Sequence, residues 1–192
     1  GLGYIEIGFR NLWNNNRTVA TLEDAKGLKI RSTPSKAHIA TLKALGMNPT
    51  PISWGEVYTA MQQKTVDGID IDLNLAWHNN FPEVNNHVTI VNSLFSPHLV
   101  MISKKFLDSL SPEDKELILT TFDEIKLYER KLIRDGEKEI MEKLADKGVT
   151  VTTLSPEERQ RWADATASVY SQFEDRIGKE LIEQAKATIA GQ

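Results

Sequence analysis

The sequence predicts an α/β protein with a mixed, mainly parallel sheet, followed by a long helix and further C-terminal helices. In residues 1–90, short β-favouring segments alternate with helix signals, which is typical of parallel strands joined by right-handed crossovers. After residue 110, apolar residues recur at helical spacing over long stretches instead. Residues 1–100 carry 8 basic and 8 acidic residues, whereas the remaining 92 carry 15 and 19. We therefore expect the two parts of the chain to be built differently.

The first strands and the first helix have local signals. The opening segment GLGYIEIGFR has the pattern of a strand interior, and residues 28–31 alternate apolar with basic side chains, which places Arg31 at the carboxyl end of a strand. Ser35 follows a turn and is expected to cap a helix that ends at Gly46.

The next helix is predicted between two extended segments, residues 49–52 and 65–71. Ser53 with Glu56 three residues later has the pattern of a capping box, in which each of the two side chains accepts a hydrogen bond from the backbone N–H of the other residue. The spacing of the apolar residues that follow favours one buried helix face.

The second part begins with a firm helix signal. Ser111 and Pro112 combine an N-cap with a proline at the first helical position, and the apolar stripe continues for about 35 residues to Gly148. Gly136 interrupts this stripe, which predicts a kink or a point of close packing.

The chain ends in further predicted elements. Residues 149–153 alternate as a strand, Ser155 and Pro156 repeat the helix-start signal, and residues 177–190 have the pattern of a last helix.

Composition excludes several classes of function. The net charge of −4 and pI of about 5.6 argue against a broad nucleic-acid-binding face. The absence of cysteine excludes disulfides, thiolate metal sites and cysteine nucleophiles, and it fits an oxidising compartment. No apolar run approaches the roughly 20 residues that span a bilayer, so the chain is not itself membrane-embedded.

Enzyme and metal motifs are largely missing. The sequence has no G-x-S-x-G elbow, no phosphate-binding loop and no H-E-x-x-H motif, and we predict no cofactor and no metal. The histidines do not have metal-ligand spacing and are interpreted as surface or loop residues. They are His38, His78, His87 and His98.

Candidate binding residues lie where parallel strands end, the usual place for ligands in such sheets. Arg10 and Arg31 could each pair with a carboxylate through a planar fork, or could be ordinary surface arginines. Trp54 could form a flat apolar wall beside such an anion, or it could pack in the core. Asp70 and Asp72 share one face of a strand and could act as a carboxylate pair or merely cap and solvate the strand end.

Several segments carry a family resemblance. In order they are GFR at 8–10, TLEDAKGLKIR at 21–31, LGMNPTPISWGEVYTAMQQ at 45–63, VDG at 66–68, FPEV at 81–84 and SKKFLDSLSPED at 103–114. With the long helix, they resemble the DctP-type solute-binding proteins of tripartite ATP-independent periplasmic (TRAP) transporters over essentially the whole chain. The part that precedes this point in the family, including most of one lobe, is missing here, and the start at Gly1 agrees with a fragment.

The resemblance implies a periplasmic receptor with two lobes that close on a small organic acid and deliver it to the membrane subunits of a TRAP permease. It implies that Arg31 forms the principal bidentate salt bridge with the ligand carboxylate and that Arg10 assists. It also implies that Trp54 lines the pocket and that Ser35 lies nearby.

One departure from the family concerns the end of the strand at residue 71. Family members commonly read V-D-G-x-E-N-P, with the Asn bonding the ligand, but here Ile71 takes the Asn position and Asp72 the Pro position. We predict that Asp70 and Asp72 tune which acid is bound by facing a hydroxyl, an amine or a bound cation, because a carboxylate repels another carboxylate.

The resemblance also suggests a division of the chain. Residues 1–90 would form the ligand-binding lobe together with strand 149–153, residues 91–110 a crossover strand and hinge, and residues 111–192 the long helix and C-terminal helices. A strand expected at 94–102 would run toward the absent lobe and leave an apolar edge through which the fragment self-associates.

Two alternatives to a transport receptor remain at this point. One is an enzyme on the same scaffold that uses Asp70 and Asp72 as acid and base, although no nucleophile, base and orienting group converge in the sequence. The other is a ligand-sensing or protein-interaction domain that uses the same binding fold without transport.

Overall fold

A six-stranded sheet forms the centre of the computed structural model, which describes residues 1–190. Its strands are β2 (Asn11–Asn14), β3 (Lys29–Ser32), β4 (Asn48–Pro51), β5 (Gly68–Ile71), β6 (His87–Ile90) and β8 (Thr150–Thr153). Their spatial order is β4-β3-β5-β2-β6-β8. β3 is parallel to β4 and β5, β6 is parallel to β8, and β2 is antiparallel to both of its neighbours. The predicted mixed, mainly parallel sheet is confirmed.

The sequence patterns missed two of these strands, β2 and β6. The four residues of β2 are all buried. A strand covered on both faces loses the polar and apolar alternation by which strands are recognised. Leu12 and Trp13 on β2 face opposite sides of the sheet and belong to different core clusters. β5 approaches β2 closely at Gly68, where an added Cβ would lie 1.9 Å from the carbonyl oxygen of Trp13.

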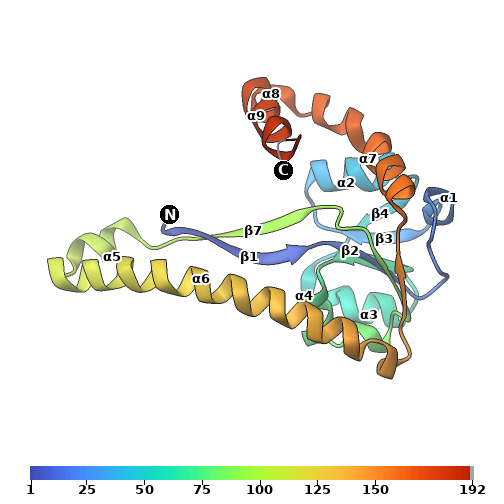
Figure 1. Cartoon of the computed structure of the whole chain (residues 1–192), viewed down its shortest axis with the longest axis horizontal. Helices are drawn as coiled ribbons and strands as arrows, with labels where there is room; N and C mark the ends of the chain where they lie inside the picture. The colour runs from blue at the N-terminus through green and yellow to red at the C-terminus, as the bar shows by residue number, and fades with distance from the viewer. Residues whose placement is uncertain (191–192) are drawn as a thin grey trace.

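Helices cover both faces of the sheet (Figure 1). One face packs against α1 (Leu22–Ala25), α2 (Lys36–Ala44) and α7 (Pro156–Ser171), and the other against α3 (Val57–Gln62), α4 (Leu73–His78) and the end of α6 (Pro112–Lys143). Trp162 anchors the first layer, and Ile140 and Leu144 anchor the second. We call this sheet with its two helix layers the lobe.

Most predicted helix starts are confirmed, and one is wrong. The Ser35, Ser111 and Ser155 side chains accept hydrogen bonds from backbone N–H groups at the starts of α2, α6 and α7. The capping box predicted at Ser53 does not form. There the backbone N–H of Glu56 donates to the carbonyl of Ser53 at 3.0 Å and closes a short 3-10 turn, so α3 begins only after it.

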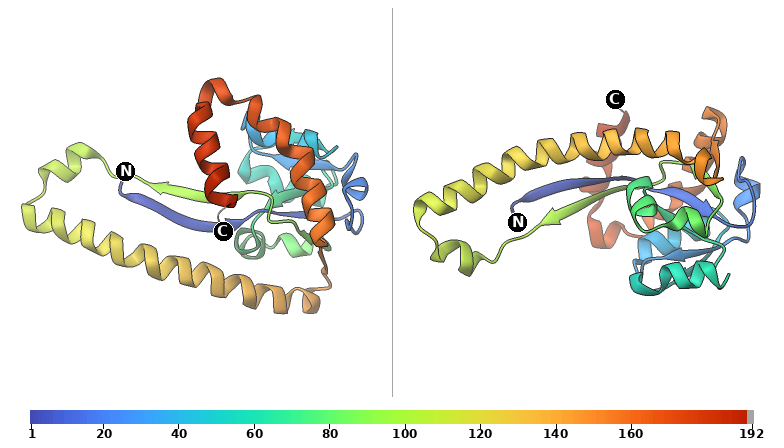
Figure 2. Two further views of the ribbon diagram at one scale, coloured as in Figure 1. Left: turned by 45° about the horizontal axis from the view of Figure 1, so that its top comes forward. Right: turned by 90° about the horizontal axis from the view of Figure 1, so that it is seen from below.

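An arm projects from the lobe. It consists of the antiparallel pair β1 (Gly3–Phe9) and β7 (Phe95–Val100), the tip helix α5 (Lys104–Ser109) and the first part of α6. α6 runs beside the two strands in all three views (Figures 1 and 2). β7 lies within the strand predicted at 94–102. The opening segment, which the sequence suggested as one strand, contains β1 of the arm, and β2 of the lobe follows directly after it.

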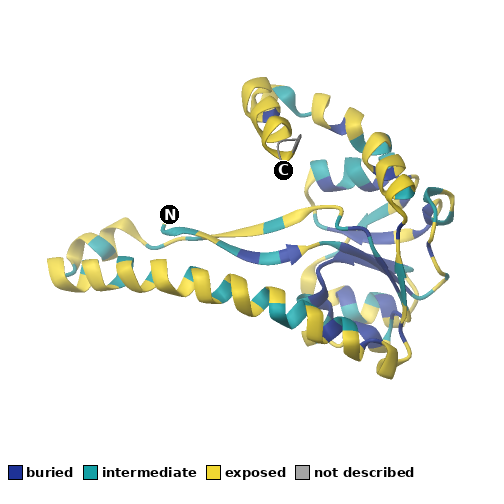
Figure 3. Ribbon diagram, in the orientation of Figure 1, coloured by how far each residue is buried: buried dark blue, intermediate teal, exposed yellow. Residues whose placement is uncertain are grey.

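The arm is far more exposed than the lobe (Figure 3). Along α6 only Ile140, near its C-terminal end, is buried; of the predicted apolar stripe, Ile118 and Phe122 are half-buried, and Ile125 and Leu132 are exposed. The exposed large apolar side chains of the arm are Tyr4, Phe9, Phe95, Leu99, Met101, Phe106, Leu117, Ile125, Leu127, Tyr128 and Leu132.

Gly136 marks close packing between α6 and α4. An added Cβ would lie 2.9 Å from Oδ1 of Asn74, and the Nδ2 of Asn74 donates to the carbonyl of Ile133 at 3.3 Å. Of the two alternatives that the sequence left open at this glycine, close packing is therefore present.

The last predicted helix, at residues 177–190, is present as α9 (Lys179–Ala190), and the short helix α8 (Glu174–Ile177) precedes it. Gly178 separates them with a φ of 93°, a left-handed conformation that glycine adopts without strain. Residues 191–192 of the predicted C-terminal segment lie outside the described residues. Within residues 1–190, no helix is long and apolar enough to cross a membrane.

Candidate ligand-binding site

Arg31 is a buried cation near the end of β3. The residue is only 5% exposed, and its Nε donates to the carbonyl of Ile52 at 3.0 Å. Within residues 1–190 no carboxylate pairs with it, and neither terminal nitrogen donates to a protein group. A buried charge without a partner is unfavourable, and two parallel terminal N–H donors match the geometry of a carboxylate. Arg31 is therefore suited to bind an anion from outside the chain.

A second guanidinium reinforces the positive charge. Arg10 lies between β1 and β2, where its Nε donates to Oγ of Ser96 at 3.0 Å and its Nη1 donates to the carbonyl of Asp70 at 2.7 Å. Burial, and secondly the like charge of Arg10, lower the pKa of Arg31. An arginine remains protonated in proteins even so, and the two cations together favour a bound anion.

Trp54 lies beside Arg31. The guanidinium carbon of Arg31 is 5.6 Å from the centroid of the indole ring, and the ring tilts against Phe81 at a centroid distance of 5.7 Å. Trp54 is 44% exposed, so it is not a core residue. It offers a flat apolar wall next to the cation, as the sequence suggested.

Asp70 and Asp72 are both buried at the end of β5, where both carboxylate oxygens of Asp70 and one oxygen of Asp72 are engaged by protein groups. Asp70 accepts from Ser93 Oγ at 3.0 Å and lies 3.0 Å from the Nε2 of His38. Asp72 caps α4 by accepting from the backbone N–H of Leu75 at 2.8 Å. Ile71, at the position of the family's Asn, packs into the core. That the two acids tune ligand choice stays a prediction.

The predicted site residues separate into two groups. Arg10, Arg31, Trp54, Asp70 and Asp72 are linked by contacts or by charge interaction. Ser35 instead caps α2 and lines a groove with residues of the C-terminal helices, including Phe173 and Arg176.

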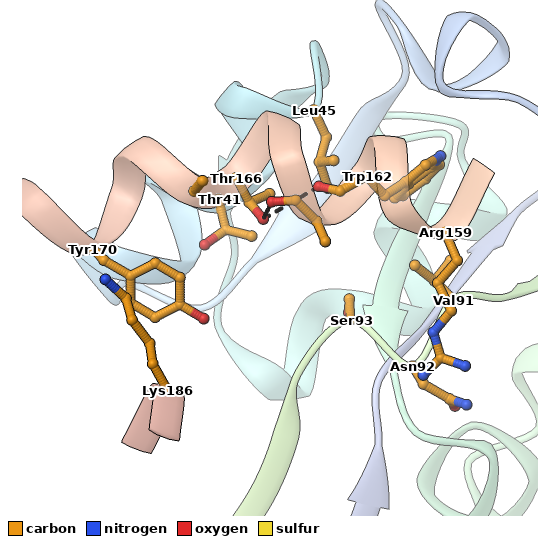
Figure 4. A pocket seen from close by; sticks show the side chains of 12 residues that line it. Thr41, Leu45, Val91, Asn92, Ser93, Arg159, Trp162, Thr166, Tyr170 and Lys186 are labelled. Atoms are coloured by element: carbon orange, nitrogen blue, oxygen red, sulfur yellow. Dashed lines mark hydrogen bonds between the residues drawn. The ribbon is translucent and has the colours of Figure 1, made fainter. Parts of the chain in front are cut away.

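Another groove lies between α2, α7 and α9 and has a volume of about 310 Å³ (Figure 4). Trp162, Tyr170 and Lys186 line it, and none of Arg10, Arg31 and Trp54 does. Ser93 is part of its wall. This groove is therefore distinct from the candidate site.

Sequence reasoning missed His38, Ser93 and Ser96. The interpretation of His38 as a surface or loop residue is wrong, because it is 7% exposed and lies in α2. Its spacing of four residues from the buried Leu42 was a usable signal, since residues i and i+4 share one helix face. Ser93 and Ser96 carried no local signal, since their partners are distant in sequence.

We predict a pH-dependent effect of Asp72 on stability. Burial raises the pKa of this carboxyl, and the nearby backbone N–H groups only partly oppose that shift. A carboxyl with a raised pKa binds its proton more tightly when folded, so its charge becomes a cost as pH rises from about 4 through the raised value. Asp72→Asn keeps a capping oxygen without this cost. The stability of the original chain relative to Asp72→Asn should therefore fall as pH rises.

Urea unfolding of the two proteins between pH 4 and 8 measures this difference. Asp72→Ala is the control, because it removes the charge and the cap together. It should be less stable than Asp72→Asn by about 1 kcal/mol at every pH. A stability difference between the original chain and Asp72→Asn that is constant with pH would contradict the assignment.

Comparison with known proteins agrees with the fold. The description "Bacterial extracellular solute-binding protein, family 7" (DctP) matches residues 1–176. The 2,3-diketo-L-gulonate-binding periplasmic protein YiaO of Escherichia coli is 36% identical over 152 residues, which are 79% of this chain and 46% of that protein. The chain spans about half the length of the curated relatives it matches.

Solved structures show the same arrangement. The sugar acid binding protein DctPAm of Advenella mimigardefordensis, in complex with galactonate, superposes with a TM-score of 0.90 at 32% identity, over 96% of this chain and 59% of that one. A TRAP periplasmic solute-binding protein of Ralstonia eutropha, with bound (S)-2-acetolactate, gives a TM-score of 0.93 at 31% identity, over 100% and 62%. Since a family match over most of the length accompanies the same fold, the chain belongs to family 7 of the bacterial extracellular solute-binding proteins.

Proposed function

We propose that this chain is the ligand-binding part of a periplasmic TRAP receptor, which binds a small organic acid through Arg31 and delivers it to a membrane permease. The observation that carries this proposal is the buried Arg31 guanidinium, which has no carboxylate partner within residues 1–190 and has both terminal nitrogens free of protein acceptors. An organic carboxylate would supply the missing negative charge in the matching geometry.

The ligand class is an organic acid that carries further oxygens besides one carboxylate, as hydroxyl or keto groups or, as in the succinate bound by other relatives, a second carboxylate. Relatives are named for or bound to 2,3-diketo-L-gulonate, galactonate and (S)-2-acetolactate, each of which has hydroxyl or keto groups. In this chain Arg31 would bind the carboxylate, and Trp54 would cover the apolar side of the ligand. The remaining terminal nitrogen of Arg10 could then donate to a neighbouring oxygen.

A binding role accounts for Asp70 better than acid and base catalysis does. Both carboxylate oxygens of Asp70 have partners inside the protein, and the Asp72 carboxylate accepts a bond as a helix cap. We propose further that the chain acts together with the region of its relatives that it does not span. The protein that contains both is called the complete receptor below.

A thermal-shift and calorimetry panel on the complete receptor tests the function. The probes are galactonate, (S)-2-acetolactate and succinate, with the uncharged galactitol as the matched control for galactonate. A ligand at 100 times its Kd that binds only the folded state stabilises it by about 2.7 kcal/mol. At least one acid should stabilise the receptor and be recovered unchanged, while galactitol should have no effect. Equal stabilisation by galactonate and galactitol, or turnover of an acid, would overturn the proposal.

A further inference from the structure

His38 is a buried histidine whose two ring nitrogens both contact neighbouring polar groups. Nδ1 lies 3.4 Å from the backbone nitrogen of Thr33 and 3.2 Å from its Oγ1. Nε2 lies 3.0 Å from Oδ2 of Asp70 and donates to it, because a carboxylate oxygen accepts. Both side chains are more than nine-tenths buried, so this donor and acceptor have no competing water.

The other oxygen of the Asp70 carboxylate is held from a different element. The Oγ of Ser93, in the connection between β6 and β7, lies 3.0 Å from Oδ1 of Asp70 and 3.3 Å from the carbonyl of Arg10, and its single proton is directed to the closer, charged acceptor. The Asp70 carboxylate thus links α2 to the connection between β6 and β7, the arm strand that follows it.

The same residues hold Arg10 from three directions. Its Nη1 donates to the backbone carbonyl of Asp70 at 2.7 Å, and its own carbonyl accepts from the backbone N–H of Ser93 at 3.0 Å. Its backbone N–H donates to the carbonyl of Leu94 at 2.9 Å. The position of the guanidinium therefore depends on where Asp70 and the segment after β6 lie.

We propose that His38, acting through Asp70, is a positioning residue for Arg10 in the binding of the organic acid. This inference rests on the proposed function and adds a role for a histidine that does not itself touch the ligand. It also gives Asp70 an indirect role in place of the predicted direct contact, because both of its carboxylate oxygens are turned toward protein donors.

Three variants of the complete receptor separate positioning from general stability. His38→Leu removes the donor to Asp70, whereas His38→Gln can present an amide N–H near the place of Nε2. Leu42→Ala is the matched control, because Leu42 is buried on the same helix and lies in the core without a bond to Asp70. It should lower stability through the cavity it leaves, without moving Asp70.

The first readout needs no ligand. The Arg10 Nε–H group is bonded to Ser96, so its NMR signal, assigned by loss in Arg10→Lys, reports the position of the guanidinium. This signal should shift or broaden in His38→Leu and remain in His38→Gln and Leu42→Ala.

The second readout is calorimetric affinity for galactonate or, if the panel selects it, succinate. His38→Leu should bind about tenfold more weakly or worse, the scale on which loss of an orienting partner weakens other binding sites. His38→Gln and Leu42→Ala should bind like the original receptor.

Ser93→Ala removes the second side-chain bond to Asp70, together with the 3.3 Å contact of Oγ with the Arg10 carbonyl, and it keeps the test open if His38→Leu fails to fold. It should move the Arg10 signal and weaken binding in the same direction. An unmoved Arg10 signal in the folded variants, or equal weakening by Leu42→Ala, overturns the positioning role. If the unaltered receptor binds no acid, the proposed function fails, whereas the Arg10 signal still decides the positioning of the guanidinium.

Discussion

Replacing Arg31 by lysine should weaken binding of the acid almost as much as replacing it by alanine. Loss of one partner of a buried charge pair costs about 2 to 5 kcal/mol of binding free energy. Lysine keeps the charge but cannot form two parallel bonds from a planar group, nor can it both donate to the Ile52 carbonyl and present two further nitrogens in one plane. The contact of the guanidinium with Trp54 would change as well.

The matched control is Arg17→Lys. Arg17 also uses its guanidinium on backbone carbonyls, those of Asp24 and Lys26, but these belong to the α1 region. This variant should lose some stability and keep its affinity. Calorimetry on the complete receptor, with the acid that the panel selects, compares the three variants. Unchanged affinity in both Arg31 variants would remove this residue from the site.

The parts of the fold that the sequence predicted have local causes. Ser35, Ser111 and Ser155 cap helices because their side chains reach backbone N–H groups only three residues away. The same logic failed at Ser53, because the chain there closes a 3-10 turn through its backbone and leaves the serine side chain without a capping bond. A capping pattern therefore indicates a helix start without fixing its first turn.

The parts that were missed depend on contacts between distant segments. β2 is a strand because β5 and β6 flank it on both sides, and the sequence of its four buried residues does not indicate this pairing. Its sequence, Asn-Leu-Trp-Asn, has no alternation of polar and apolar residues, because both faces of the strand are covered.

The candidate site divides in the same way. Arg31 was predictable because it ends a strand whose own pattern is clear, and ligands gather at such ends. The partners of Asp70 could not be predicted, since His38 lies 32 residues before it and Ser93 lies 23 residues after it. Only the packing of α2 and of the segment after β6 against β5 brings these side chains together.

The isolated 192-residue chain should bind the acid at least about a hundredfold more weakly than the complete receptor. A small ligand in a formed site is typically about 70 to 90% buried, and burial strengthens polar contacts because water is excluded. Arg31 and Trp54 can cover the acid from one side only. Every 1.4 kcal/mol of binding free energy that is lost raises the Kd tenfold, so loss of the opposite wall of the site has a large effect. Titration of both proteins with the same acid, by calorimetry and NMR, measures the ratio, and equal affinities would contradict a two-walled site.

The isolated chain should also self-associate through its arm. β1 and β7 pair only with each other within residues 1–190, and Leu99 and Met101 are 45% and 75% exposed, so a free strand edge lies beside apolar side chains. Such an edge is a template for pairing with another chain. Sedimentation at high concentration should show dimers or larger species, and Leu99→Lys should reduce them. Ile189→Lys is the matched control, since Ile189 is an exposed apolar residue of α9 outside the arm, and it should leave association unchanged. A monomer at all concentrations, or equal relief by both lysines, would show that the arm is not the contact.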